Sequence, residues 1–344
     1  MPPSPDSCAV VVTSIAGPND VMRRLAELSQ RRNCRFFVIG DVKSPAHFEL
    51  ESCDFYSLDR QSRLDFRLAR LLRTRSYARK NLGYLLGMQP GCEWLTETDD
   101  DNMPNETFLA PRQLNVSGDS VSSRGWVNAY AYFTPEFIYP RGFPLEAIQS
   151  TTKPLPPRGP RTCLPSPIQQ FLTDGNPDVD AVYRMLCKLP LTFDRNPSIL
   201  LGQNAWCPFN SQTTVFLKCA FPLMYLPTFC TFRMTDVWRS FVAQRILWTC
   251  GWHLSFHAAI AFQQRNEHNM LRDFEDEIPG YLGNALIAET LENLDLKPGP
   301  ERIGENLLRC YEALVKLGKV SADELPLVQA WLDDLAALRK GVTH

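Results

Sequence analysis

Cys8-Ala9-Val10-Val11-Val12-Thr13-Ser14-Ile15 is a continuous run of small and β-branched residues near the start of the chain. A strand without polar alternation is buried on both faces, as the strands of a parallel sheet are. A turn at residues 17–20 follows this run, and apolar residues then recur at helical spacing up to residue 33. We therefore predict a central strand over residues 8–15 that leads directly into a helix.

The next hundred residues continue this alternation. Residues 35–41, Arg-Phe-Phe-Val-Ile-Gly-Asp, predict a second buried strand with a turn at its end. A further helix is expected from Ser76 to a stop at Pro90-Gly91, and a short strand over residues 93–96 follows. The pattern predicts an α/β protein with a Rossmann-type mixed sheet flanked by helices, which binds ligands at the carboxyl ends of its strands.

Composition excludes several classes of protein. The chain has 344 residues, with 36 Lys and Arg against 38 Asp and Glu, so it has no excess positive charge for nucleic acid as a main partner. Its apolar runs are far shorter than the ~20 residues of a transmembrane helix, and residues 1–7 lack the features of a signal peptide. The eleven cysteines include no CxxC pair. We expect reduced thiols and a cytoplasmic location, either free or peripheral to a membrane.

The chain divides into a large domain and a helical end. Residues 1–283 are predicted to form one domain, with a ligand-binding half at about 8–110 and a second half at about 111–283. Six prolines between residues 153 and 168 predict an ordered surface loop without regular structure. From residue 284 to 344 apolar stripes at helical spacing predict a C-terminal helical appendage.

An acidic cluster follows the strand over 93–96. Residues 97–102, Glu-Thr-Asp-Asp-Asp-Asn, place carboxylates where they repel one another unless a cation lies among them. Such oxygen ligands suit Mg²⁺ or Mn²⁺, although a solvated acidic turn has the same composition. Arg79, Lys80 and Asn81 lie upstream on the helix that leads into this strand. Cations beside a metal-binding carboxylate cluster indicate a nucleotide diphosphate site.

These residues also carry a family resemblance. The strings S-Y-A-R-K-N-L-G-Y-L-L-G-M (76–88) and W-L-T-E-T-D-D-D-N-M-P (94–104) are similar to the DxD-containing segment of nucleotide-sugar glycosyltransferases with the GT-A fold. The chain more closely resembles the STELLO glycosyltransferase family of plants, over roughly residues 8–290. Strings at 127–146, 174–184, 208–214 and 235–245 support this resemblance. It implies a GT-A-like domain that transfers a sugar from a nucleotide sugar, expected to be a UDP-sugar.

The resemblance also implies roles for individual residues. Asp99 falls on the metal position of DxD, and Glu97 replaces the first Asp, which commonly faces the ribose. Asp100 is expected beside the donor, and Asp101 is either a second metal ligand or a first-turn cap. The metal is expected to be Mn²⁺ or Mg²⁺, with His268 as an additional ligand. Thr13 and Asp41 are either contacts to the uracil and ribose or simple strand-end turn residues. Of Arg79 and Lys80, at most one is expected to reach the diphosphate while the other stays in solvent.

The second half of the chain is expected to supply the base and the acceptor site. Asp236 opens an apolar-periodic helix, and the resemblance makes it the base of an inverting transfer, although helix capping is an alternative role. Asn210, Gln212 and Arg239 are predicted to contact the acceptor, which is a glycan, a lipid or a protein. The oligomeric state stays open.

Two other classes compete with this hypothesis. Nucleotidyl transfer commonly uses a basic Gly-rich loop after the first strand, but residues 13–18 contain no basic residue. A catalytically degenerate member of the fold, which binds a nucleotide sugar or a protein, is suggested only by Glu97 in place of Asp.

Overall fold

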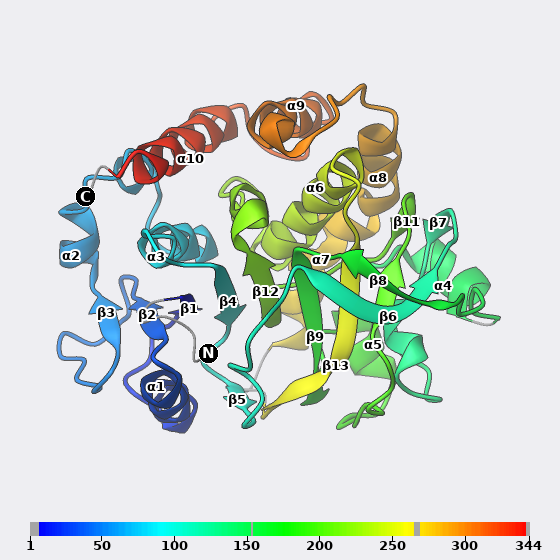
Figure 1. Ribbon diagram of the computed structural model, residues 1–344, viewed down its shortest axis with the longest axis horizontal. Coiled ribbons are helices and arrows are strands. Elements are labelled where there is room, and N and C mark those ends of the chain that lie inside the picture. Colours follow the sequence, from blue (N-terminus) through cyan, green and yellow to red (C-terminus); the bar gives the residue numbers. More distant parts are fainter. Residues whose placement is uncertain (1–6, 153, 265–268, 342–344) are drawn as a thin grey trace.

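The predicted mixed α/β fold is confirmed. The computed structural model describes residues 7–152, 154–264 and 269–341, and Figure 1 shows a large twisted sheet with helices packed around it. The main sheet has eleven strands, ten of them in the order β3-β2-β1-β4-β12-β9-β13-β10-β6-β8, and β5 pairs with β13 outside this path. Strands β7 (Gly125–Trp126) and β11 (Ala205–Trp206) form a small separate sheet.

The N-terminal half of the sheet is parallel, as its apolar runs predict. It contains β1 (Cys8–Thr13), β2 (Arg35–Ile39), β3 (Asp54–Tyr56) and β4 (Trp94–Thr98). Helix α1 (Asp20–Arg32) connects β1 to β2, and the Asn19 side chain caps it by accepting from the backbone N–H of Met22. Helix α3 (Lys80–Gly87) leads into β4. All four strands therefore present their carboxyl ends at one edge of the sheet.

The second half of the sheet is mixed. Strand β12 is antiparallel to both β4 and β9, whereas β13 is parallel to β9. The strands of this half are β5 (Asn102–Pro104), β6 (Asn115–Val121), β8 (Arg161–Pro165), β9 (Ile168–Gly175), β10 (Ile199–Leu201), β12 (Thr213–Leu217) and β13 (Leu254–Gln263). The antiparallel neighbour β12 brings the loop before it to the edge where β1, β2 and β4 end.

The prediction that the proline-rich segment lacks regular structure is confirmed for residues 154–160 but wrong for residues 161–165. Residues 161–165 form β8, and β9 begins at Ile168. The reason lies in the position of the strand, because β8 is at the end of the sheet and pairs only with β6. A proline on an edge strand removes no ladder hydrogen bond when its missing N–H faces outward. Pro165 accordingly ends β8, and Pro167 lies between the two strands.

Helices cover the sheet, and those after residue 284 are present as predicted. The α-helices not yet named are α2 (Leu58–Ser62), α4 (Leu145–Thr152), α5 (Ala181–Leu186), α6 (Thr235–Thr249), α7 (Met270–Tyr281), α8 (Asn284–Glu292), α9 (Ile303–Lys316) and α10 (Glu324–Arg339). The 3₁₀ turns are η1 (Leu68–Arg70), η2 (Tyr77–Arg79), η3 (Ala129–Tyr132), η4 (Lys218–Met224), η5 (Phe232–Met234) and η6 (Pro300–Arg302). None of the helices in the described ranges has the length and apolar character to span a bilayer.

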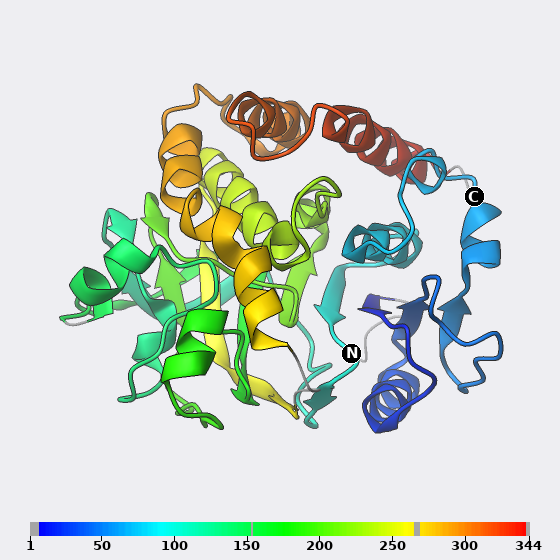
Figure 2. The same cartoon turned by 180° about the vertical axis from the view of Figure 1, so that it is seen from behind.

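The C-terminal helices pack on the core of the sheet domain. Figures 1 and 2 show α10 running from α9 toward α3 and the N-terminal half. The indole N–H of Trp331 donates to the carbonyl of Pro222 at 3.0 Å. Asp334 accepts the backbone N–H groups of Arg67 and Leu68, both at 2.9 Å. Helix α10 therefore ties η4, in the second half of the chain, to η1, in the first half.

Candidate functional site

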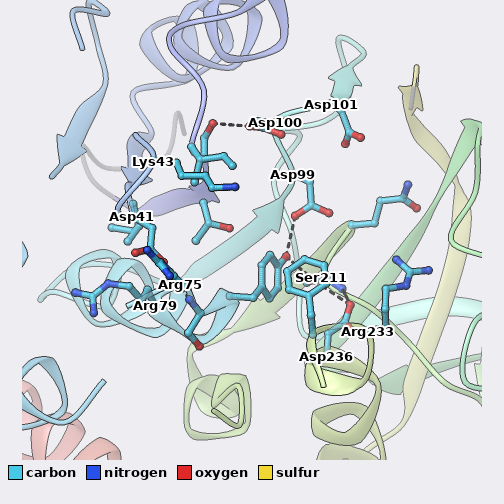
Figure 3. Close-up of a pocket in the computed structure, with 18 of the residues that line it drawn as sticks. Asp41, Lys43, Arg75, Arg79, Asp99, Asp100, Asp101, Ser211, Arg233 and Asp236 are labelled. Carbon is cyan, nitrogen blue, oxygen red and sulfur yellow. Dashed lines mark hydrogen bonds between the residues drawn. The ribbon is translucent and has the colours of Figure 1, made fainter. Parts of the chain in front are cut away.

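A cavity of about 570 Å³ opens at the carboxyl ends of β1, β2 and β4 (Figure 3). It lies at the sheet edge where the sequence places a ligand site. Of the predicted donor and metal residues, Thr13, Asp41, Arg79, Asp99, Asp100 and Asp101 line it. Gln212 and Asp236 line its other wall, which is built by the loop before β12 and the start of α6. The fold therefore brings residues from both halves of the chain to one space.

Asp99 lies near the middle of the cavity and is held by two side chains. Its Oδ1 accepts from the Tyr77 hydroxyl at 2.7 Å and from Lys80 Nζ at 3.1 Å. Lys80 is completely buried and also donates to the Tyr77 oxygen and the carbonyl of Thr98. Its three N–H groups are thus all committed to the protein. Lys80 therefore positions Asp99 and has no donor left for a phosphate.

Figure 3 shows the carboxylates of Asp99, Asp100 and Asp101 directed toward different parts of the cavity. Asp100 accepts from the Ser14 hydroxyl, and burial, only partly opposed by this hydrogen bond, raises the pKa of the Asp100 carboxyl. Asp101 accepts from Gln263 Nε2 at 2.9 Å. Within the described ranges, no three His, Cys, Asp or Glu side chains converge in a group able to hold a metal ion.

One carboxylate oxygen of Asp99 could nevertheless bind a metal ion that is also bound by the phosphates of a ligand. Among the described residues, Oδ2 of Asp99 has no hydrogen-bond partner, and the Asp99 side chain is 32% exposed. Mg²⁺ is usually held by one or two carboxylates, by waters and by substrate phosphates rather than by a complete protein cage. Asp99 therefore fits a metal that is held jointly with a diphosphate. His268 lies outside the described residues.

Arg79 and Asn81 make most of their polar contacts with the protein interior. The Arg79 guanidinium donates to Gln61 Oε1 at 2.7 Å and to the carbonyls of Leu72 and Arg73 at 3.2 Å. The Asn81 amide exchanges two hydrogen bonds with the backbone of Leu226. The expectation that either Arg79 or Lys80 stays in solvent is wrong, because the interior supplies partners for both.

Glu97 and Arg239 form a buried ion pair that lies outside the cavity lining. The Arg239 guanidinium contacts both Glu97 oxygens, at 2.6 and 2.9 Å, and the Tyr84 hydroxyl also donates to Glu97. Both partners are at most 1% exposed. The structure therefore contradicts the predicted ribose contact of Glu97 and the predicted acceptor contact of Arg239. Each side chain satisfies the charge of the other between β4 and α6.

Asn210 is also directed into the protein. Its Nδ2 donates to the Tyr130 hydroxyl at 3.1 Å, and its Oδ1 accepts the N–H of Gln212 at 3.0 Å. Its side chain therefore shapes the loop before β12 and is absent from the cavity lining, which contradicts the predicted acceptor contact. Ser211 and Gln212, the next two residues of this loop, do line the cavity.

Asp236 belongs to a buried charge network. Arg141 Nη2 donates to both Asp236 oxygens, at 3.0 and 2.9 Å, and also pairs with Asp178. The N–H and hydroxyl of Ser211 both donate to Asp236 Oδ2 at 3.0 Å. Burial by itself raises the pKa of the Asp236 carboxyl, but the charge and hydrogen bonds of Arg141 outweigh burial and hold this pKa well below its usual range. Asp236 is therefore ionised at neutral pH.

The alternative prediction, that Asp236 caps helix α6, is wrong. The N-cap residue of α6 is Met234, and no side chain caps this terminus. Asp236 instead lies in the first turn, where a negative charge is stabilised by the helix dipole. The Ser211 hydroxyl lies 2.7 Å from the Tyr77 hydroxyl, so a chain of polar contacts runs from Asp236 through Ser211 and Tyr77 to Asp99.

Two cations in the cavity are available to a ligand. Arg141 pairs with Asp178 and Asp236, and Arg233 pairs with Glu277 at 2.8 Å. In the described part of the chain, Lys43 and Arg75 line the cavity without forming an ion pair or hydrogen bond. Arg75 has a φ of 56°, in the left-handed region that non-glycine residues seldom adopt. Backbone strain of this kind is concentrated at functional sites.

The sequence analysis missed several of these residues. They are Lys43, Arg75, Tyr77, Arg141, Phe232, Arg233 and Gln263. Two of these residues could have been predicted as cavity residues from the sequence. Lys43 follows the strand-end residue Asp41 by two positions, and Tyr77 is the second residue of the quoted string 76–88. Arg141 and Gln263 gave no signal, because their approach to the cavity depends on long-range packing.

Comparison with known proteins agrees with the resemblance seen in the sequence. A family model described as STELLO glycosyltransferases matches residues 233–342, which include Asp236 and the C-terminal helices. The chain is related to the STELLO glycosyltransferases. It is 25% identical to the probable glycosyltransferase STELLO2 of Arabidopsis thaliana over 348 residues and 27% identical to STELLO1 of the same plant over 352 residues. These matches cover 95% and 96% of this chain but 44% of each relative, so this STELLO relative spans less than half their length.

Proposed function

We propose that this STELLO relative is a metal-dependent glycosyltransferase that moves a sugar from a UDP-sugar to an acceptor with inversion. The observation that carries the proposal is the position of Asp99. Its partly free carboxylate lies between the side of the cavity that holds Lys43 and Arg75 and the side that holds Asp236 (Figure 3). A donor diphosphate bound at Asp99 would place the sugar between these two sides.

The nucleoside is expected at the ends of β1 and β2. Thr13, Asp41 and Val42 line this part, and Asp41 Oδ2 already accepts the N–H of Ser76 at 3.0 Å. That hydrogen bond fixes the carboxylate beside the strained segment that carries Arg75. Lys43 and Arg75 would then neutralise the diphosphate, a role that Lys80, whose three N–H groups all bond the protein, cannot take.

The metal is proposed to be Mn²⁺ or Mg²⁺ held by Asp99. When bound, it would supply positive charge to the departing diphosphate. Because no three possible ligand side chains converge among the described residues, the donor phosphates must contribute the remaining affinity. Lys80 and Tyr77 hold Asp99 in place, and Asp101 is engaged with Gln263.

Asp236 is proposed as the base. The ionised state that Arg141 enforces is the state that can accept a proton, but a low pKa makes a weak base. Proton transfer is then expected late, when the forming bond has made the acceptor hydroxyl more acidic. The alternative function is a catalytically inactive protein that binds a nucleotide sugar. It is favoured by the hydrogen bonds of Asp236, because both of its oxygens already accept from Arg141 and one also accepts from Ser211.

An activity assay separates these functions. Purified protein is incubated with Mn²⁺ and a panel of UDP-sugars, and the release of UDP is measured together with the anomeric form of the released sugar by NMR. We expect slow hydrolysis that yields UDP and, first, the inverted anomer. Release of UMP and a sugar phosphate would indicate cleavage within the diphosphate. Binding of UDP without hydrolysis of any donor would indicate a binding protein.

A further inference from the structure

The cavity wall beside Asp236 carries an aromatic ring that the protein leaves open. Phe232 lines the cavity and is 57% exposed. Its ring packs edge-on against Tyr77, with centroids 5.4 Å apart and an interplanar angle of 77°. This contact fixes the orientation of the ring while much of its surface stays in water, which costs free energy. A ligand with an apolar face could cover the ring.

An unsatisfied acceptor lines the same cavity. Gln263 is 8% exposed, and its Nε2 donates to Asp101 Oδ2. Its Oε1 is buried and has no hydrogen-bond partner among the described residues. A buried acceptor without a partner costs about 1–3 kcal/mol, so a rotation of this amide that presents Oε1 to an O–H or N–H group of a ligand in the cavity would recover this energy.

The surroundings of the ring decide the class of ligand. Arg233 and Asp236 follow Phe232 closely in the sequence, and Asp178 and Gln212 line the same cavity. A lipid chain needs a continuous apolar wall, which these polar groups interrupt. A pyranose instead combines an apolar C–H face, which covers an aromatic ring, with hydroxyl groups that donate to amide and carboxylate oxygens.

We propose that Phe232 and Gln263 form an acceptor subsite for a carbohydrate, so that the hydroxyl group glycosylated by this protein belongs to a glycan. The inference rests on the proposed function, because it names the acceptor class of the same cavity. In the transfer, the glycan hydroxyl oxygen bonds to the anomeric carbon while the bond from that carbon to the diphosphate oxygen breaks. The diphosphate takes the electron pair, and the hydroxyl proton passes to Asp236.

Binding to an array of neutral oligosaccharides tests this subsite. The whole chain is applied with and without UDP and Mn²⁺. We expect wild-type protein to bind at least one oligosaccharide, and Phe232→Ala and Gln263→Leu each to weaken that binding about tenfold, the effect of losing one ring contact or hydrogen bond. Phe232→Trp should retain binding because it keeps a ring. The matched control is Phe137→Ala, since Phe137 is 48% exposed but lies outside the cavity lining.

Two results would overturn the carbohydrate subsite. One is that wild-type protein binds no oligosaccharide on the array, and the other is that Phe232→Ala binds as well as wild type. Calorimetry with UDP on each variant shows whether the cavity is intact, which separates loss of the subsite from misfolding. If wild-type protein binds an oligosaccharide through Phe232 but never binds UDP, the proposed donor function fails while the carbohydrate subsite stands.

Discussion

The charges of the cavity are distributed so that most cations already have partners. Lys80, Arg79, Arg141 and Arg233 all bond protein groups, whereas Lys43 and Arg75 have no hydrogen bond or ion pair within the described ranges and can meet a diphosphate.

We expect Lys43→Ala and Arg75→Ala each to weaken UDP binding about tenfold, since each removes a charge-assisted contact of about 1.5 kcal/mol. Isothermal titration at low salt measures the effect. Lys218→Ala is the matched control, because Lys218 pairs with Glu93 outside the cavity lining, and UDP affinity should not change in this variant. Normal UDP affinity in both variants of Lys43 and Arg75 would show that the diphosphate binds elsewhere.

The role of Asp236 can be separated from binding. Asp236→Asn should lower UDP-sugar hydrolysis by a factor on the order of 10² to 10⁴ while UDP affinity stays near wild type, because a base acts only as the transition state forms. Asp178→Asn is the control, because it removes the other carboxylate that pairs with Arg141. It shows how much of the effect comes from a weakened ion pair of Arg141 rather than from loss of the base. Hydrolysis at the wild-type rate by Asp236→Asn would exclude it as the base.

At the scale of elements, one ion pair ties strand β4 to helix α6. Glu97→Gln breaks the buried contact with Arg239 and leaves an uncompensated charge, so we expect a loss of about 3–5 kcal/mol in unfolding free energy. UDP affinity, measured well below the melting temperature, should not change. Urea denaturation and calorimetry check both statements. A variant that is as stable as wild type but binds UDP more weakly would instead support a contact between Glu97 and the ribose.

Strand β13 gives a prediction about pH. Burial, and then the charge of Arg112, lowers the pKa of His257 to about 3, and both ring nitrogens contact serine hydroxyls. Between about pH 6.5 and 3 the unfolded chain binds a proton that the folded chain does not, so stability falls as pH falls, by up to about 1.4 kcal/mol per unit. His257→Phe keeps the stack on Phe171 and should remove this component. An unchanged pH dependence in the variant would contradict a neutral, half-buried His257.

At the scale of the whole molecule, the sequence predicted what local patterns determine. The buried strands β1 and β2 follow from continuous apolar runs, and the position of Asp99 follows from the short strand β4 that precedes it. The pair of Glu97 and Arg239 could not be predicted, because these residues are 142 positions apart and meet only when α6 packs against β4. Arg75 was missed because a loop conformation, which no periodicity reveals, directs it to the cavity. Strand β8 was missed because only its edge position tolerates the prolines around it.

The central claim is that Asp99 holds a metal only together with a nucleotide diphosphate. Calorimetric titration of UDP into the wild-type chain, with and without Mn²⁺, tests it most directly. We predict that Mn²⁺ alone binds weakly, that Mn²⁺ strengthens UDP binding at least tenfold, and that Asp99→Ala removes this enhancement. Equal UDP affinity with and without Mn²⁺ in wild-type protein, or an undiminished enhancement in Asp99→Ala, would contradict the account.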